Sequence, residues 1–321
     1  MNLLNLASAK LGAQAIECSD DSFASMDRLL QDHDAVWKED VYDDFGKWMD
    51  GWESKRRRSG GFDWCIIKLA VPGQIEHFIV DTSYFTGNYP PGAQIWGATG
   101  GSQPDADSDR WVALSDILSL NGNDQQNAAC TDRDGVYQWL KFDIYPDGGV
   151  ARLRVMGNAV VEHSGGERIE LSALINGGRV TAYSDAHYGN VEAVLTAGRG
   201  QDMGDGWETK RRREPGHEWI ILELGVPGYI DEIEIDTAHF KGNFPGGFTL
   251  QAADMPKLGD QAIVTQAMFW DEVVPFHPLE ADKIHRFTLD TPTGRVTHIK
   301  VNNIPDGGMS RIRAFGIPAH D

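Results

Sequence analysis

The sequence predicts an all-β protein made of two tandem copies of one sandwich domain, and three observations support this prediction. A set of motifs occurs twice along the 321 residues. Short apolar runs alternate with turn residues, among them 36 glycines and 14 prolines, as is typical of strands joined by turns. No long segment has the 3.6-residue period of an amphipathic helix. We therefore expect two homologous antiparallel sandwiches of the jelly-roll kind, each able to bury its own core.

The repeat is defined first by two motifs that keep the same spacing. Gly51–Arg58 reads GWESKRRR, and Gly206–Arg213 reads GWETKRRR, 155 positions later. The same offset relates Asp81–Pro90 (DTSYFTGNYP) to Asp236–Pro245 (DTAHFKGNFP). Two long motifs at one offset indicate duplication of a whole structural unit.

A third motif sets the limits of the two copies. The pattern PDGGxxRxRxxG begins at Pro146 and again at Pro305. Its offset is larger by four residues, so the second copy has a short insertion before this motif. Ser19-Asp20 matches Ser184-Asp185 at an offset of 165, so the first copy has ten extra residues before its GWE motif. We expect a first domain over 1–157, a linker over 158–168 and a second domain over 169–321.

Each copy predicts the same series of strands. An Asp-Gly turn at Asp50-Gly51 opens a short strand. Trp64–Val71 and Ile75–Asp81 are apolar runs on either side of a Pro-Gly dipeptide, which predicts two strands joined by a turn. Arg152–Met156 follows the PDGG turn as the closing strand. The equivalent runs of the second copy are Trp219–Val226, Ile230–Asp236 and Arg311–Phe315.

Charge and cysteine content narrow the possible partners and compartment. The formal net charge is −19, which repels nucleic acid and anionic membranes, so we expect neither as a partner. The three cysteines show no CxxC spacing, which favours reduced thiols. The N-terminus does not resemble a secretion signal, and no apolar stretch is long enough to span a bilayer. We therefore expect a cytoplasmic protein.

The repeated basic run is the strongest candidate for an anion site. In a strand, two of its four cations would face inward, where each needs a carboxylate partner or a bound anion. We take Lys55 and Arg57, with Lys210 and Arg212, as candidate anion binders. The alternative is a surface run, or a scaffold, satisfied by acidic neighbours, and the sequence leaves both open. The candidate partners are Glu53, Asp63 and Asp81 in the first copy, and Glu208, Glu218 and Asp236 in the second.

Two further pairs of residues are candidates for polar recognition. Asn88 and Asn243 follow the strand-ending aspartates and can both donate and accept hydrogen bonds, although a Gly-Asn turn also needs no ligand. Arg154 and Arg313, in the closing strands, can clamp a carboxylate with two parallel hydrogen bonds. The commoner reading of these arginines is a solvent-facing strand position.

Histidines distinguish the two copies. His187, His217 and His239 have no histidine at the matching positions of the first copy, so a single catalytic copy would be the second. Asp185-Ala186-His187 begins like the metal-binding Asp-Ala-His-x-Asp motif, but Gly189 stands where the second aspartate belongs. We reject this segment as a metal motif, and a divalent metal such as manganese stays open.

Taken together, the motifs GWE[ST]KRRR, DTxxFxGNxP and PDGGxxRxRxxG, each present twice, resemble those of the allantoicase family, and the resemblance spans nearly the whole chain. It implies two galactose-binding-like jelly rolls and hydrolysis of allantoate to ureidoglycolate and urea in purine degradation. On this reading Glu208 or Asp236 performs acid–base chemistry, with His239 or His187 as further candidates. Allantoate is then the small-molecule partner, and we expect a homo-oligomer. The alternatives are a non-catalytic tandem binding protein and a lyase acting on another ureido acid.

Overall fold

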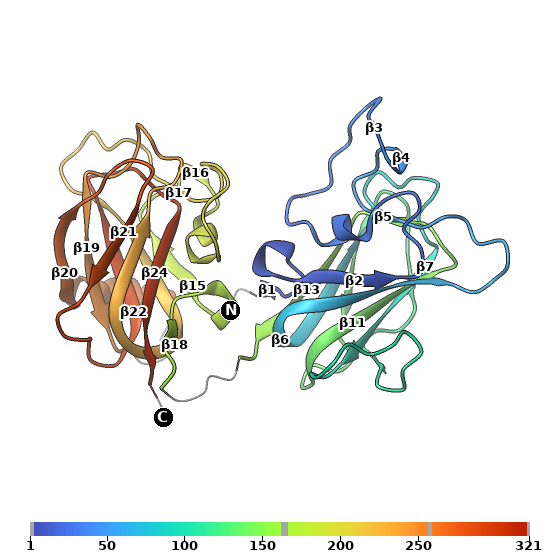
Figure 1. Cartoon of the computed structure of the whole chain (residues 1–321). Helices are drawn as coiled ribbons and strands as arrows, with labels where there is room; N and C mark the ends of the chain where they lie inside the picture. The colour runs from blue at the N-terminus through green and yellow to red at the C-terminus, as the bar shows by residue number, and fades with distance from the viewer. Residues whose placement is uncertain (1–2, 162–165, 256–258, 320–321) are drawn as a thin grey trace. The chain divides into compact units, whose positions relative to one another are not determined.

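The computed structural model describes residues 3–161, 166–255 and 259–319, and the chain divides into two compact units, Met1–Val161 and Glu162–Asp321. We call these the first and the second module. Both consist of β-strands and short 3-10 turns, and the described residues contain one α-helix, α1 (Asp260–Gln266) (Figure 1). The prediction of two tandem β-sandwiches is confirmed. No helix among the described residues is both long and apolar enough to cross a membrane.

The two modules share one strand order. The main sheet of the first is ordered β1-β13-β6-β11-β7-β8, and that of the second β14-β24-β18-β22-β19-β20. The first module contains β1 (Leu4–Asn5), β2 (Gln14–Cys18), β3 (Tyr42–Asp43), β4 (Gly46–Lys47), β5 (Trp52–Glu53), β6 (Asp63–Asp81), β7 (Gly92–Ala98), β8 (Val112–Ala113), β9 (Leu118–Ser119), β10 (Gln125–Ala129), β11 (Val136–Tyr145), β12 (Gly149–Val150) and β13 (Arg152–Ala159). The second contains β14 (Ile169–Glu170), β15 (Arg179–Tyr183), β16 (Tyr188–Gly189), β17 (Trp207–Glu208), β18 (Glu218–Asp236), β19 (Gly247–Ala253), β20 (Asp271–Pro278), β21 (Ile284–Thr288), β22 (Val296–Ile304), β23 (Gly308–Met309) and β24 (Arg311–Pro318).

One long strand organises each module by belonging to both layers of the sandwich. The first half of β6 pairs with β2 and β11, and its second half pairs with β10 and β13. Its inward side chains, among them Ile67, Phe78 and Val80, are fully buried in the core of the first module. Strand β18 repeats this arrangement with β15, β22, β21 and β24.

The predicted turn at the Pro-Gly dipeptide is wrong, because β6 and β18 each run through it without interruption. The ladder between β6 and β11 shifts register here, as expected where extra residues bend a strand. Gly73 also permits a close approach, since a Cβ on it would lie 2.5 Å from Leu6 Cδ1 and 2.8 Å from the Asn158 carbonyl oxygen. The dipeptide therefore bends the strand from one sheet into the other instead of reversing the chain.

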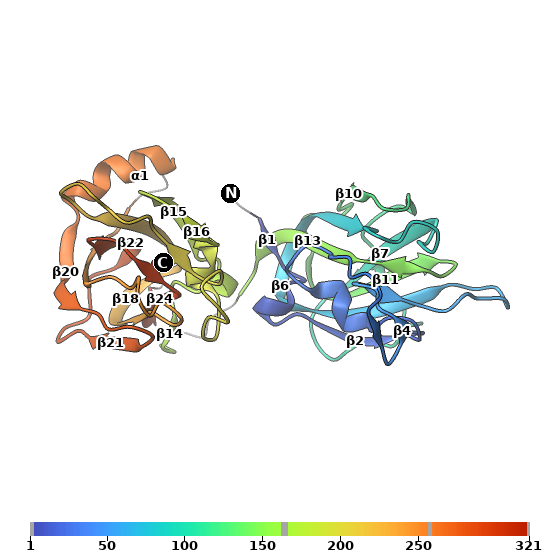
Figure 2. The ribbon, with the colours of Figure 1, turned by 90° about the horizontal axis from the view of Figure 1, so that it is seen from above.

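The outer face of the central sheet differs between the modules. In the first, Trp111 and Trp139 pack with Ile66 beneath a loop. In the second, Ile263 of α1 packs with Ile221 and Trp270, and Figure 2 shows α1 beside β15. The helix lies in the part of the second copy where the sequence places its insertion.

Strand β13 continues through Ala159, so the first two residues of the expected linker lie in a strand. It extends this far because its last residues pair with Gly73 and Gln74 of β6. Residues 162–165 of that linker lie outside the described part of the chain.

Candidate active site

A buried tryptophan fixes the start of the candidate site in each module. Trp52 and Trp207, in the GWE motifs, are fully buried. Their indole Nε1 atoms donate to the carbonyl oxygens of Asp20 and Asp185 at 2.9 and 2.8 Å. Because each tryptophan side chain points inward, the glutamate that follows it lies on the opposite side of the short strand. The motif therefore anchors a glutamate beside the segment that carries Asp20 or Asp185.

The predicted glutamates and asparagines are brought together as pairs. Asn88 Nδ2 donates to Glu53 Oε1 at 2.7 Å, and Asn243 Nδ2 donates to Glu208 Oε1. Neither Oε2 has a hydrogen-bond partner among the residues that the structure describes. Burial raises the pKa of Glu53, and the Asn88 bond opposes this. Each pair thus holds one carboxylate oxygen and leaves the other available to a ligand.

The basic run is not a strand, so the expectation that two of its cations face inward is wrong. Residues 55–58 and 210–213 form loops that are largely exposed. Lys55 Nζ lies 2.8 Å from Asp20 Oδ2, and Lys210 Nζ lies 3.1 Å from Asp185 Oδ1. The same aspartates accept from the backbone N–H of these lysines, each at 2.8 Å. Asp20 or Asp185 therefore anchors the start of each loop, a contact that the sequence did not predict.

A second anchor holds the third residue of each run, and here one of the three predicted partners in each copy is confirmed. Arg57 Nε lies 2.7 Å from Asp63 Oδ1, and Arg212 Nη1 lies 2.8 Å from Glu218 Oε1. The aspartate of each PDGG motif, Asp147 or Asp306, accepts from the backbone N–H of the same arginine at 2.7 or 2.9 Å. This explains why the basic run and the distant PDGG motif recur together.

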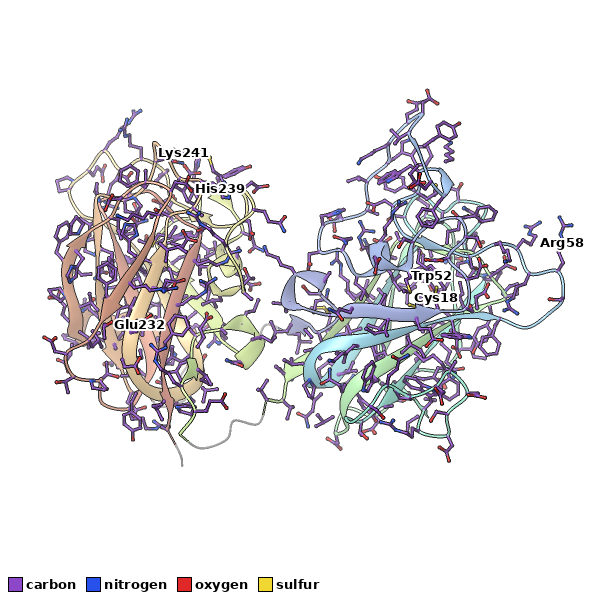
Figure 3. The ribbon with its side chains drawn as sticks, viewed as in Figure 1. Cys18, Trp52, Arg58, Glu232, His239 and Lys241 are labelled. Carbon is purple, nitrogen blue, oxygen red and sulfur yellow. The ribbon has the colours of Figure 1, made fainter. Side chains whose placement is uncertain are left out.

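Two arginines of each run make no hydrogen bond or ion pair with the described residues: Arg56 and Arg58 in the first module, and Arg211 and Arg213 in the second. Arg58 lies on the loop that extends from the first module (Figure 3). The sequence pattern predicted anion binding by their neighbours Lys55, Arg57, Lys210 and Arg212, all of which are paired with carboxylates. Every second cation of each run is paired, but which two are paired depends on the anchoring acids, which lie far away in sequence.

His187 lies beside the second-module glutamate. Its backbone N–H donates to the Glu208 carbonyl oxygen at 2.8 Å, and the next residue, Tyr188, pairs with Glu208 in the β16–β17 ladder. In the first module Ala24 pairs with Glu53, as Tyr188 does with Glu208, and the N–H groups of Phe23 and Ala24 both donate to the Glu53 carbonyl oxygen at 3.2 Å. The histidine therefore occupies a position that the first module fills with an apolar ring.

Asp236 and His239 belong to a different network. Asp236 is fully buried and accepts from the Ala238 N–H at 2.9 Å and from Arg199 Nε at 3.3 Å. His239 Nε2 lies 2.8 Å from the Gly200 carbonyl oxygen. Figures 1 and 3 show His239 at the same end of the second module as β16 and β17.

Asp81 takes the same buried place in the first module, with its oxygens accepting from the Ser83 N–H at 2.7 Å and from Gln125 Nε2 at 2.9 Å. The expectation that Asp81 and Asp236 bridge to the basic runs is therefore wrong. Each strand end is instead capped by its own following turn.

The closing-strand arginines each lie beside carboxylates of their own module. Arg154 Nη2 lies 3.3 Å from Asp34 Oδ1, and Arg313 is bound to Glu234 and lies 3.5 Å from Glu170. Each is thus already paired with a carboxylate, in place of the free clamp that the sequence suggested.

Their neighbours Arg152 and Arg311 are buried. Arg152 Nη2 lies 2.8 Å from Asp50 Oδ2, and Arg311 Nη2 lies 2.9 Å from Asp205 Oδ2. Both arginines also donate to the carbonyl oxygen of that aspartate. They hold the Asp-Gly turn that leads into each GWE motif.

Comparison with known proteins places the whole arrangement in a family. Residues 4–160 and 169–319 each match the model of the allantoicase repeat. A probable allantoicase from Acinetobacter baumannii is 46% identical over 314 residues, covering 97% of this chain and 93% of that protein. The chain belongs to the allantoicase family. A probable allantoicase 1 from Burkholderia mallei is 47% identical over 317 residues, covering 98% of this chain and 94% of that protein.

The fold agrees with that of a solved allantoicase. The crystal structure of the allantoicase from Saccharomyces cerevisiae matches with a TM-score of 0.80 at 33% identity, covering 98% of this chain and 93% of that one. In this member of the allantoicase family, no group of three or more His, Cys, Asp or Glu side chains in the described ranges is arranged to hold a metal ion. These residues thus offer no ligand set for manganese, and we derive no step through a metal.

Proposed function

We infer that this chain is an allantoicase, which hydrolyses allantoate to ureidoglycolate and urea. The observation that carries this conclusion is the match of both modules to the allantoicase repeat, together with relatives of that name at 46% and 47% identity over nearly the full length. The reaction breaks the bond between the α-carbon of allantoate and one ureido nitrogen. The α-carbon gains the hydroxyl of water, and the departing nitrogen gains a proton as urea leaves.

We place this chemistry in the second module. The reaction needs a base for the attacking water and an acid for the leaving nitrogen. Glu208 has one oxygen held by Asn243 and one free of partners in the described chain, which suits a base. His187 immediately precedes β16, its backbone N–H donates to the Glu208 carbonyl oxygen, and it is our candidate for the acid. The first module has Phe23 at this place and therefore lacks a side chain that can transfer a proton there.

Recognition of the substrate carboxylate is assigned to the basic loop of the same module. Lys210 is paired with Asp185, and Arg212 with Glu218, whereas Arg211 and Arg213 are free of partners in the described chain. A guanidinium binds a carboxylate with two parallel hydrogen bonds. The loop provides local positive charge in a protein of net charge −19. Asp236 and His239 stay candidates for a supporting role at the same end of the module.

The direct test is urea release from allantoate by the purified full-length chain. N-carbamoylglycine is the matched control, because its α-carbon bears one ureido group and no second nitrogen to support departure of urea. We expect stoichiometric urea from allantoate, none from the control, and no loss of rate after extensive chelation. No urea from allantoate would overturn the assignment and favour a binding protein. A rate lost to chelator and restored by manganese would contradict the roles given to Glu208 and His187. That the enzyme is cytoplasmic and a homo-oligomer stays a prediction.

A further inference from the structure

The first module contains a pocket of about 210 Å³ that the proposed reaction does not use. It is lined by Ser19, Asp20, Asp63 and the loop 55–59. A cavity of this size admits a small molecule. Four consecutive cations line it, Lys55 to Arg58, and two of the four are already neutralised by Asp20 and Asp63.

The remaining charge of the pocket favours an anion. Arg56 and Arg58 have no partner among the described residues. The chain carries 48 acidic residues against 29 basic ones, so carboxylates for pairing are abundant. Two guanidinium groups left unpaired on one loop are therefore available to a carboxylate ligand.

A buried acceptor in the same pocket points to a second ligand group. Asp63 is about 1% exposed. Its Oδ1 accepts from Ser19 Oγ at 2.8 Å and from Arg57 Nε at 2.7 Å. Its Oδ2 is buried and has no hydrogen-bond partner. A buried carboxylate oxygen without a partner is costly, and an N–H donor on a ligand would satisfy it.

The second module has no unpaired carboxylate oxygen at the equivalent position. Glu218 stands in place of Asp63, and its longer side chain reaches both partners: Oε2 accepts from Ser184 Oγ, and Oε1 accepts from Arg212 Nη1. The unsatisfied atom there is Arg212 Nε instead. The difference of one methylene group thus leaves an available acceptor in the first module and none at the equivalent place of the second.

We propose that this first-module pocket is a separate binding site for a small carboxylate that bears N–H donors, the class to which ureido acids belong, and that it binds without turnover. The carboxylate is held by Arg56 and Arg58, and the N–H groups donate to Asp63 Oδ2. Turnover is absent because Phe23 stands where the second module has His187. The ligand class extends the proposed function, but the binding can be measured without it.

The test is isothermal titration of the full-length chain with N-carbamoylglycine, which carries both groups and is not a substrate of the proposed reaction. We expect two sites per chain, one in each module. The double variant Arg56→Ala/Arg58→Ala should bind one, and the matched double variant Arg211→Ala/Arg213→Ala should also bind one. Asp63→Glu, which copies the second module, should weaken one site at least tenfold. Acetate should bind the first-module site at least tenfold more weakly, since it has no N–H donor.

Two results would overturn the proposal. One is a single site in the wild type that only Arg211→Ala/Arg213→Ala removes. The other is that Arg56→Ala/Arg58→Ala and Asp63→Glu both bind N-carbamoylglycine as the wild type does. Arg56 and Arg58 are exposed, so their variant stays informative if Asp63→Glu fails to fold. If no urea is released from allantoate but the titration shows two sites, the proposed enzymatic function is wrong and the proposed binding site is supported.

Discussion

The two modules share their scaffold and differ in what the scaffold displays. Each has a buried tryptophan bonded to an aspartate carbonyl, a lysine paired with that aspartate, and a buried arginine behind the Asp-Gly turn. On this common frame the second module places His187 where the first places Phe23, and Glu218 where the first has Asp63. Most contacts that hold the loops are thus the same in both copies, while two positions that can meet a ligand have diverged.

The largest effect we expect concerns the shared frame. Arg152→Met and Arg311→Met should each lower the free energy of unfolding of their own module by about 3–5 kcal/mol, because each removes the cation that pairs with a buried aspartate and a donor to backbone carbonyl oxygens. Arg154→Met, whose partner Asp34 is 92% exposed, is the control and should cost less than about 1 kcal/mol. Urea denaturation measures all three. A large loss in only one module would show that the frame is not equivalent in the two.

The next effect concerns the divergent histidine. His187→Phe gives the second module the residue of the first and should lower kcat roughly 100-fold, about 2.7 kcal/mol, because a proton donor is lost. The reciprocal change, Phe23→His, should alter kcat less than about threefold. Steady-state urea release measures both. An unchanged kcat in His187→Phe would remove this residue from the acid role.

A buried carboxyl group, that of Asp143, should make the stability of the first module depend on pH differently from that of the second. Burial raises the pKa of Asp143 to about 6, an effect that Lys141, 3.6 Å away, opposes. A raised carboxyl pKa means that the folded state holds the proton more tightly, so stability falls as pH rises from about 4 to about 6. The second module has Asn302 at this place, because Asn302 pairs with Trp219 as Asp143 pairs with Trp64.

Asp143→Asn should therefore increase the stability of the first module by roughly 1–3 kcal/mol at pH 8, with little change at pH 4. Thermal denaturation across this pH range measures the difference. A variant less stable than the wild type at pH 8 would mean that the Lys141 pair outweighs the burial of Asp143.

The smallest effect concerns the loop anchors. Burial tends to raise the pKa of Asp20, but hydrogen bonds from Lys55 outweigh it and lower this pKa to about 2. The stabilisation is therefore full above pH 4 and is lost as pH falls through 2. At pH 7, Asp20→Asn should cost less than about 1 kcal/mol and speed trypsin cleavage within 55–58. Asp185→Asn should do the same within 210–213. An unchanged cleavage rate in both variants would show that other contacts hold the loops.

Repeated motifs made much of this predictable. The two-sandwich fold, the closing strands and the partners Asp63 and Glu218 follow from patterns that occur twice. The Pro-Gly bend was misread as a turn because local turn chemistry does not reveal that a strand continues into a second sheet. The free arginines were missed because Asp20 and Asp147, which decide which cations are occupied, are distant in sequence. The expected bridge from Asp236 to the basic run was wrong because its pairing with Arg199 is a tertiary property.

The central claim is that catalysis belongs to the second module, although both modules carry the same glutamate–asparagine pair. The most direct test compares urea release from allantoate by Glu208→Gln and Glu53→Gln. We predict that Glu208→Gln lowers kcat at least 100-fold and that Glu53→Gln lowers it less than about tenfold. Equal losses, or a larger loss in Glu53→Gln, would contradict the account.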